Sequence, residues 1–282
     1  MRTLAHLSDL HFGRVDHALL EPLAASVKAA HPDVVVVSGD LTQRARTAQF
    51  VQAAAFLAGL PSPQVVVPGN HDVPLFDIAA RLLHPLDKFR RLIEPTLLPT
   101  HVDEEIAVLG LNTARALVMK NGRIDAAQVA ALRETLCALP DEVVKVVVAH
   151  HPFDVAPHLD ENLLVGGARS AMAMFAECGV DLLLAGHLHA SHSGGTGARH
   201  ALAGYEALMV SAGTATSTRV RGESNSFNVL HVTKHRIEVE QHRWQPRLGQ
   251  FEVAGRAAFE RQDNAWRARS EAGRPAERGQ VA

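Results

Sequence analysis

Residues 34–40, Val-Val-Val-Val-Ser-Gly-Asp, decide the fold class of this chain of 282 residues. Four consecutive β-branched residues are typical of a strand that is covered on both faces, as in a parallel sheet. The strand ends at Ser38, and Gly39 allows the backbone to bend sharply before Asp40. The segment therefore predicts a buried strand whose carboxyl end delivers a carboxylate.

The same pattern of a short apolar strand followed by polar residues recurs on both sides of this segment. Helical spacing between the strands predicts an alternation of strand and helix, and three further strands then follow without a long helix between them. Such an order predicts an α/β fold in which two sheets pack face to face with helices outside. The expected strands lie at 3–7, 34–37, 64–67, 106–111, 143–149, 181–185, 208–211, 227–232 and 237–243, and the helices at 17–30, 47–57, 77–93, 125–136 and 170–178.

Residues 1–250 are expected to form one domain, because no linker or internal repeat interrupts them. The remainder, 251–282, is expected to be a C-terminal helical segment and a flexible tail. Within it, 256–269 has the pattern of one amphipathic helix, and 270–282 has the composition of a disordered chain. Cys137 and Cys178 each lie in an apolar helical stretch and are expected to be buried free thiols.

Composition and charge exclude several classes of protein. Hydrophobic residues make up 47% and charged residues 21%, as in an ordinary globular protein and unlike a disordered, collagenous or coiled-coil chain. No apolar run approaches the ~20 residues that span a bilayer, and the first residues show no signal-peptide pattern. The cytoplasm is therefore the expected location. A formal net charge of −2 gives no basic excess, so no nucleic-acid partner is expected.

Metal-binding side chains follow five of the predicted strands. Because the carboxyl ends of parallel strands meet at one edge of a sheet and carry ligands there, these side chains are expected on one rim. One Asp-x-His or His-x-His pair is a common strand ending, but five such endings together indicate a metal site. The residues are Asp9, His11, Asp40, Asn70, His71, His150, His187 and His189.

The ligand types narrow the choice of metal. Imidazole, carboxylate and amide groups without thiolate suit manganese or iron, with zinc or cobalt as alternatives. A catalytic ion usually takes about three protein ligands, so eight candidates are too many for one ion. Two divalent ions roughly 3.5–4 Å apart could share a bridging carboxylate and act on both oxygens of a phosphoryl transfer.

The ordered motifs Asp9-x-His11, Gly39-Asp40, Gly69-Asn70-His71-Asp72, His150 and Gly186-His187-x-His189 resemble those of the calcineurin-like metallophosphoesterases. They span about two thirds of the chain. The resemblance implies a four-layer α-β-β-α sandwich in which two mixed sheets are flanked by helices and a dinuclear site lies at the sheet edge. Within the family, the motifs are most similar to the class III cyclic-nucleotide phosphodiesterase branch.

The resemblance also implies a role for each motif residue. Asp9, His11 and His189 would bind one ion; Asn70, His150 and His187 would bind the second; and Asp40 would bridge the two. His71 would contact the substrate phosphate and assist the leaving group, with Asp72 orienting it. The implied activity is hydrolysis of small phosphodiesters, including 3′,5′-cyclic nucleotides, by in-line attack of a metal-bridging hydroxide.

Two rival functions stay open. One is a phosphoanhydride or phospholipid-type hydrolase of the same superfamily, in which the histidine equivalent to His71 is typically arginine. The other is a non-catalytic scaffold that keeps its metals, although such proteins usually lose ligands and none is missing here.

Four features are left with alternatives. Asn112 and His151 are candidate substrate contacts, or else a turn residue and a supporting histidine. The segment 77–93 is either a surface helix packed on the domain or a lid or membrane-facing patch. Self-association through the strands at 225–243 or the segment 256–269 would make a homo-oligomer.

Overall fold

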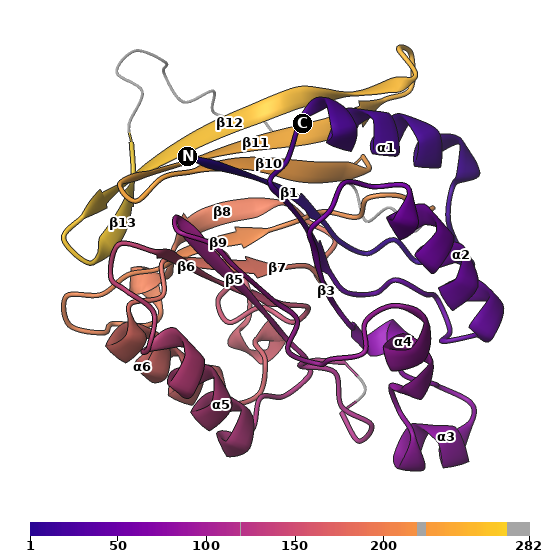
Figure 1. Cartoon of the computed structure of the whole chain (residues 1–282), viewed down its shortest axis with the longest axis horizontal. Helices are drawn as coiled ribbons and strands as arrows, with labels where there is room; N and C mark the ends of the chain where they lie inside the picture. The colour runs from indigo at the N-terminus through magenta and orange to yellow at the C-terminus, as the bar shows by residue number, and fades with distance from the viewer. Residues whose placement is uncertain (119, 219–223, 270–282) are drawn as a thin grey trace.

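Two mixed sheets packed face to face form the middle of the molecule, and helices cover both outer faces (Figure 1). This computed structural model describes residues 1–118, 120–218 and 224–269. The first sheet has the order β13-β12-β11-β10-β1-β2-β3 and the second the order β4-β5-β6-β7-β9-β8. The arrangement confirms the four layers and two mixed sheets expected from the sequence.

The first sheet is parallel over β1, β2 and β3 and antiparallel beyond β1. Leu7 lies opposite Val37 and Ser38 lies opposite Val67, so the carboxyl ends of these three strands are level with one another. Its strands are β1 (Arg2–Leu7), β2 (Val34–Ser38), β3 (Gln64–Val67), β10 (Ser226–Val232), β11 (Arg236–Gln245), β12 (Gln250–Gln262) and β13 (Ala265–Ala268).

The second sheet is parallel from β5 through β6 and β7 to β9, with antiparallel strands at its two edges. The edge strands β4 and β8 were not expected from the sequence. The strands are β4 (Thr100–Val102), β5 (Ile106–Leu111), β6 (Val144–Ala149), β7 (Leu182–Ala185), β8 (His192–Gly195) and β9 (Leu208–Ser211).

The helices divide between the two outer faces. Helix α1 packs with Leu23 and α2 with Phe50 against the first sheet. Helix α5 packs with Leu132 and α6 with Phe175 against the second sheet (Figure 1). A third apolar layer, which includes Val36, fills the space between the sheets. The helices are α1 (Leu20–Ala29), α2 (Thr47–Ala58), α3 (Ile78–Leu83), α4 (Asp87–Leu92), α5 (Ala126–Leu136) and α6 (Ala168–Cys178). Short 3-10 turns lie at His17–Leu19, Asn70–Asp72, Glu161–Leu163 and Thr196–Ala198.

The helix expected over 256–269 is wrong, because this segment belongs to β12 and β13. Residues 250–260 pair antiparallel with the whole length of β11, and β13 then pairs back onto β12. Phe259 and Trp266 are buried against the layer between the sheets. Strand pairing and burial therefore override the local helical pattern. The expected flexible tail, 270–282, lies outside the described residues.

The single helix expected over 77–93 is two short helices, α3 and α4, which are separated around Pro85. Proline lacks a backbone N–H and clashes with the preceding turn, so it interrupts a helix. The expected helix is thus completely broken at this position. Among the described residues, no helix is both long and apolar enough to cross a bilayer.

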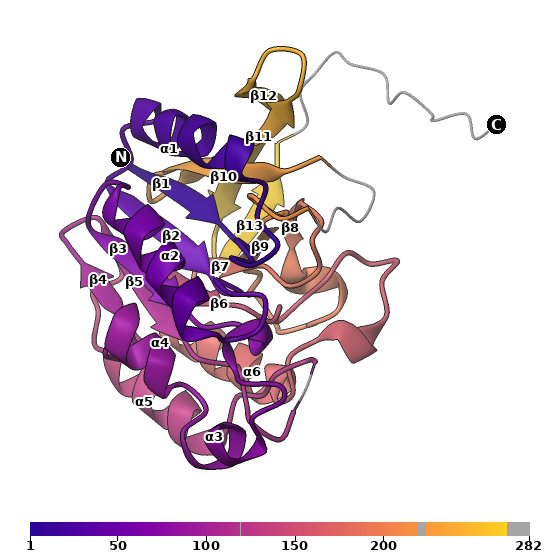
Figure 2. The same cartoon turned by 90° about the vertical axis from the view of Figure 1, so that its right-hand side faces the viewer.

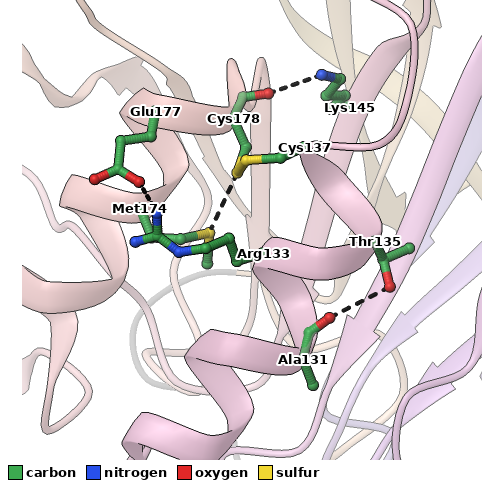
Figure 3. The surroundings of a disulfide bond; sticks show 8 residues. All are labelled: Ala131, Arg133, Thr135, Cys137, Lys145, Met174, Glu177 and Cys178. Atoms are coloured by element: carbon green, nitrogen blue, oxygen red, sulfur yellow. Dashed lines mark hydrogen bonds and ion pairs between the residues drawn. A yellow bond between two sulfur atoms is a disulfide. The ribbon is translucent and has the colours of Figure 1, made fainter.

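The expectation of two free thiols is also wrong, because Cys137 and Cys178 form a disulfide (Figure 3). Cys137 ends α5 and Cys178 ends α6, and the two helices pack side by side so that the two Cα atoms are 4.5 Å apart. The sequence could not show this, because 41 positions separate the cysteines. Disulfides are rare in cytosolic proteins, so the pair weighs against the expected cytoplasmic location.

Reduction of this disulfide is expected to destabilise the fold. Closing a loop of 41 residues removes unfolded-state entropy worth about 4 kcal/mol in the chain-entropy model. Urea unfolding with and without dithiothreitol measures the change in the free energy of unfolding. The Cys137→Ser variant, the control, should match the reduced protein and show no further response to dithiothreitol. Equal stability of the oxidised and reduced chains would contradict the prediction.

Candidate metal centre

Five of the predicted ligands adopt a left-handed backbone conformation. Residues other than glycine rarely take this backbone conformation, because their Cβ atom crowds the following carbonyl group. Such residues concentrate at functional sites, where the surrounding structure holds them in place. Only eight non-glycine residues of the described chain have positive φ, and five of them are Asp9 (55°), His11 (50°), Asp40 (52°), His187 (71°) and His189 (59°).

Two glycines let the backbone approach these ligands closely. A Cβ atom on Gly69 would overlap the Asp40 carboxylate, and one on Gly186 would overlap Ser8 Oγ and lie 2.7 Å from Asp9 Oδ2. The strand-end glycines identified in the sequence are therefore required by the packing of the centre. Any larger residue would displace a carboxylate.

One group of candidate ligands contains Asp9, His11 and His189, which come from the ends of β1 and β7. Their ligand atoms lie within 4.8 Å of one another. Asp9 Oδ1 is 3.4 Å from both His11 Nε2 and His189 Nε2. Among the described residues, buried Asp9 Oδ1 and His11 Nε2 have no hydrogen-bond partner. Buried polar atoms are normally hydrogen-bonded, so the chemistry and placement of these atoms fit a cation.

The second group surrounds His150 at the end of β6. Its Nε2 atom is 3.2 Å from Asn70 Oδ1, 3.3 Å from His187 Nδ1 and 3.4 Å from Asp40 Oδ2. Asp40 Oδ2 is also 3.7 Å from His11 Nε2 in the first group. One oxygen of Asp40 thus faces both groups, which is the position that a bridging carboxylate requires.

In both Asp9 and Asp40, one carboxylate oxygen accepts hydrogen bonds from the protein and the other faces the metal centre. Asp9 Oδ2 accepts hydrogen bonds from Ser8 Oγ (2.6 Å) and the His187 backbone N–H (3.1 Å). Asp40 Oδ1 accepts one from the His71 backbone N–H (2.8 Å). The remaining oxygens are therefore fixed in direction before any ligand binds.

Two histidines are oriented in the same way. His150 Nδ1 donates to the Ser38 carbonyl (2.8 Å), which leaves Nε2 directed at the centre. His189 Nδ1 contacts Thr214 Oγ1 (2.6 Å). Such partners fix the ring and the tautomer of a ligating histidine. Ser8 and Thr214 could not be identified as supports from the sequence, because nothing in their spacing marks them.

Burial and mutual charges shape the protonation of the centre. Burial lowers the pKa of His150, but the Asp40 and Asp9 carboxylates outweigh it and raise the pKa to about 9. Burial and the neighbouring His150 lower the pKa of His187 to about 3. Burial raises the pKa of Asp40, but His150 and His11 outweigh it and hold the pKa well below its ordinary value. The ionised Asp40 carboxylate and the neutral His187 imidazole are forms that bind metals, whereas His150 would release a proton when it binds one.

His71 lies beside these groups without belonging to either. Its ring centroid is 5.0 Å from that of His11, with the two planes at 90°. Its Nδ1 faces the Gln43 carbonyl oxygen at 3.0 Å, and Gln43 Nε2 is 3.2 Å from the same atom. A ring held through Nδ1 in this way can turn Nε2 toward a substrate.

The Asp72 carboxylate, which the resemblance gives as the group that orients His71, is directed at backbone amides. Both oxygens of the Asp72 carboxylate accept hydrogen bonds elsewhere: from the backbone N–H groups of Leu41, Thr42 and Gly69 and from Thr42 Oγ1. Asp72 therefore ties the loop after β2 to the loop after β3, while the Gln43 carbonyl contacts the His71 ring. Sequence reasoning missed Gln43 because a backbone carbonyl leaves no signature in a motif.

The two tentative substrate contacts occupy different environments. Asn112 Oδ1 accepts a hydrogen bond from the Ala114 backbone N–H (2.9 Å), as a turn residue does. His151 is buried, its Nδ1 contacts Thr113 Oγ1 (2.8 Å), and its ring centroid is 4.7 Å from that of His187. Its ligand atom lies within 4.8 Å of those of His150 and His187. His151 thus borders the second group more closely than sequence reasoning suggested.

This chain is similar to known phosphoesterases in sequence and in fold. Residues 2–191 match the model of the family described as calcineurin-like phosphoesterase. A probable cyclic nucleotide phosphodiesterase of Rhodopseudomonas palustris is 27% identical over 201 residues, which cover 67% of this chain and 72% of that protein. A glycerophosphodiester phosphodiesterase of Enterobacter lignolyticus is 35% identical over 80 residues, 24% of this chain and 29% of that protein. In fold, purple acid phosphatase from yellow lupin superposes with a TM-score of 0.68 at 11% identity, over 92% of this chain and 53% of that one.

Proposed function

Because this chain belongs to the calcineurin-like phosphoesterase family, we propose that it is a dinuclear metal-dependent phosphodiesterase that hydrolyses small phosphodiesters. The observation that carries the proposal is the single Asp40 oxygen that faces two groups of ligand atoms, one around Asp9 and one around His150. One ion in each group could share that oxygen. Two ions about 3.5–4 Å apart suit the displacement of an alcohol from a phosphodiester.

In this proposal the two groups of ligand atoms each hold one divalent ion. Asp9, His11 and His189 hold one ion, and Asn70, His150 and His187 hold the other, with Asp40 between them. When bound, divalent ions supply Lewis-acid polarisation of the phosphoryl oxygens and lower the pKa of water. Manganese and iron are the proposed ions, because histidine, carboxylate and amide ligands without thiolate suit them, as they suit zinc or cobalt.

His71 is proposed to act on the leaving group. Its Nδ1 is held by Gln43, so Nε2 can donate a hydrogen bond or a proton to the departing alkoxide. A positioned general acid of this kind typically contributes about 10²–10⁴-fold to the rate. Asp72 supports this group indirectly, by fixing the loops on which His71 and Gln43 lie.

The proposed substrates are small diesters, including 3′,5′-cyclic nucleotides. Two relatives named as cyclic nucleotide phosphodiesterases, with similarity over 67% and 66% of this chain, support that class over glycerophosphodiesters, where the similarity covers 24% and 56%. The presence of His71 argues against a phosphoanhydride hydrolase, since the related enzymes of that type typically have arginine at this position.

The substrate class is tested with two chromogenic esters. With added Mn²⁺, we expect faster turnover of bis(p-nitrophenyl) phosphate than of p-nitrophenyl phosphate, because the proposed reaction is diester hydrolysis. In Asn70→Ala, which removes an amide oxygen of the second group, turnover of the diester should be lost. A preference for the monoester would make the chain a phosphatase. Inactivity toward both esters in a protein that retains two metals would contradict the proposal and favour the scaffold.

A further inference from the structure

Five large apolar side chains are exposed on two segments that follow β3 and β5. The edge formed by these strand ends and the metal centre is called the catalytic rim here. Residues 73–83 follow the turn that carries Asn70 and His71, and residues 112–118 follow β5. A cluster of large apolar side chains that is exposed to water commonly marks an interaction surface. The apolar rim patch consists of Phe76 (76% exposed), Ile78 (69%), Leu82 (53%), Leu83 (71%) and Leu117 (84%).

The two segments of the patch are held together. Arg81, on α3, donates from Nε to the Ala116 carbonyl (2.7 Å) and from Nη1 to the Pro74 carbonyl (2.9 Å). Arg115 and Val118 form an antiparallel bridge, so Leu117 lies at the tip of a tight turn. No residue of α3 is buried, and Ile78 and Leu82 are four positions apart on one face of it. The helix therefore presents its apolar side chains outward without contributing to the core.

Basic side chains outnumber acidic ones around the patch. The Arg44 guanidinium lies 5.7 Å from the centroid of the Phe76 ring, and Arg90 and Arg91 are exposed in the last turn of α4. Residues 73–94 hold four basic side chains, Arg81, Lys88, Arg90 and Arg91, against three acidic ones, Asp77, Asp87 and Glu94. Asp77 accepts a hydrogen bond from the Ala80 backbone N–H (2.9 Å), and Asp87 is 3.2 Å from His84 Nδ1.

We propose that the apolar rim patch docks onto a membrane surface that contains anionic lipids. Exposed leucine, isoleucine and phenylalanine beside arginine are the combination by which interfacial segments enter the headgroup region. Docking of a second copy through the same patch would bring Arg44, Arg90 and Arg91 of both copies to one interface, and the excess of like charge opposes such a contact.

The place of the patch gives the docking a consequence. Helix α3 lies at the periphery of the molecule, at the end away from the β11–β12 hairpin (Figures 1 and 2). Docking there would hold the catalytic rim near the headgroups, while the hairpin would remain in water. The inference does not depend on the proposed function, because membrane binding is measured without catalysis.

The test is co-sedimentation of the full chain with vesicles of phosphatidylcholine alone or of phosphatidylcholine with phosphatidylglycerol. We expect binding to the anionic vesicles and about ten-fold or more weaker binding to the neutral ones. The double variant Ile78→Ser/Leu83→Ser should lose at least about ten-fold in binding. Its midpoint of urea unfolding should stay close to that of the unmodified chain, which shows that it folds.

The matched control is Val51→Ser/Leu248→Ser, which replaces two apolar side chains of similar exposure (52% and 59%) outside the patch. This control should bind vesicles as the unmodified chain does. Equal loss in both double variants, or no binding of the unmodified chain to either vesicle, would overturn the proposal. Equal binding to both vesicles would overturn the anionic preference. An oligomer in size-exclusion chromatography that the patch variant alone converts to monomer, without vesicle binding, would show that a second copy covers the patch.

Discussion

Replacement of Asp40 by asparagine is expected to reduce phosphodiester turnover by about 10³-fold or more. A loss of about 4 kcal/mol of transition-state stabilisation corresponds to that factor. In the structure, Asp40 Oδ2 faces His11 and His150, which belong to different ligand groups. Asparagine keeps the size of the side chain but removes the negative charge, so neither group retains a bridging anion. Metal analysis should show fewer than two ions per chain, and steady-state kinetics should show the loss in kcat.

The control for this variant is Asp181→Asn. Asp181 is equally buried but lies before β7, at the opposite end of the second sheet, where Arg261 and Trp266 contact it. This variant should lose stability, because it weakens a buried ion pair, yet keep two metals and its kcat well below the unfolding temperature. Full metal content and normal kcat in Asp40→Asn would show that Asp40 does not bridge two ions.

Much of the centre could be anticipated because its ligands lie at the ends of buried strands. The runs of valine at β2 and β6 predict parallel strands, and the parallel strands of a sheet bring their carboxyl ends to one edge. The strand ends place Asp40 at the edge of the first sheet and His150 at the edge of the second, and the face-to-face packing of the two sheets makes them neighbours. The same argument places Asp9 at the first edge and His187 at the second.

The groups that orient His71 and the candidate ligand His150 could not be anticipated in this way. His71 is held by the backbone carbonyl of Gln43, and His150 by that of Ser38. A carbonyl group is present at every position, so no residue type marks it. The Asp72 carboxylate next to His71 was the natural choice from the sequence, but a tight turn directs it to backbone amides instead.

The C-terminal strands show the second limit of sequence reasoning. The pattern of 256–269 fits a helix. In the folded chain, however, the edge of β11 that β10 does not occupy pairs with β12, and this edge forms only when the sheet does. The disulfide is the third case, since the contact between α5 and α6 that joins Cys137 to Cys178 is a property of the assembled layer. Non-local pairing decided both features, and local propensity could not.

Replacement of His71 by alanine is expected to leave both metals bound and to reduce turnover by about 10²–10⁴-fold for substrates with alkoxide leaving groups. The His71 ring lies beside His11 but belongs to neither ligand group, and Gln43 holds its Nδ1. Its removal should therefore cost proton donation rather than metal affinity. Metal analysis and kcat for a cyclic nucleotide measure the two effects separately, and loss of a metal would show that His71 is a ligand.

The dependence on the leaving group separates a general acid from a residue that only supports the site. A p-nitrophenolate leaves without a proton near neutral pH, so bis(p-nitrophenyl) phosphate should lose much less turnover in His71→Ala than a cyclic nucleotide does. A supporting residue would lower both rates by the same factor, because its loss would disturb the metals or the phosphate position. The variant Gln43→Ala is the matched comparison: it keeps the backbone carbonyl that contacts His71 Nδ1 and removes only the side-chain amide. If that carbonyl orients the ring, Gln43→Ala should keep most of the turnover with both substrates.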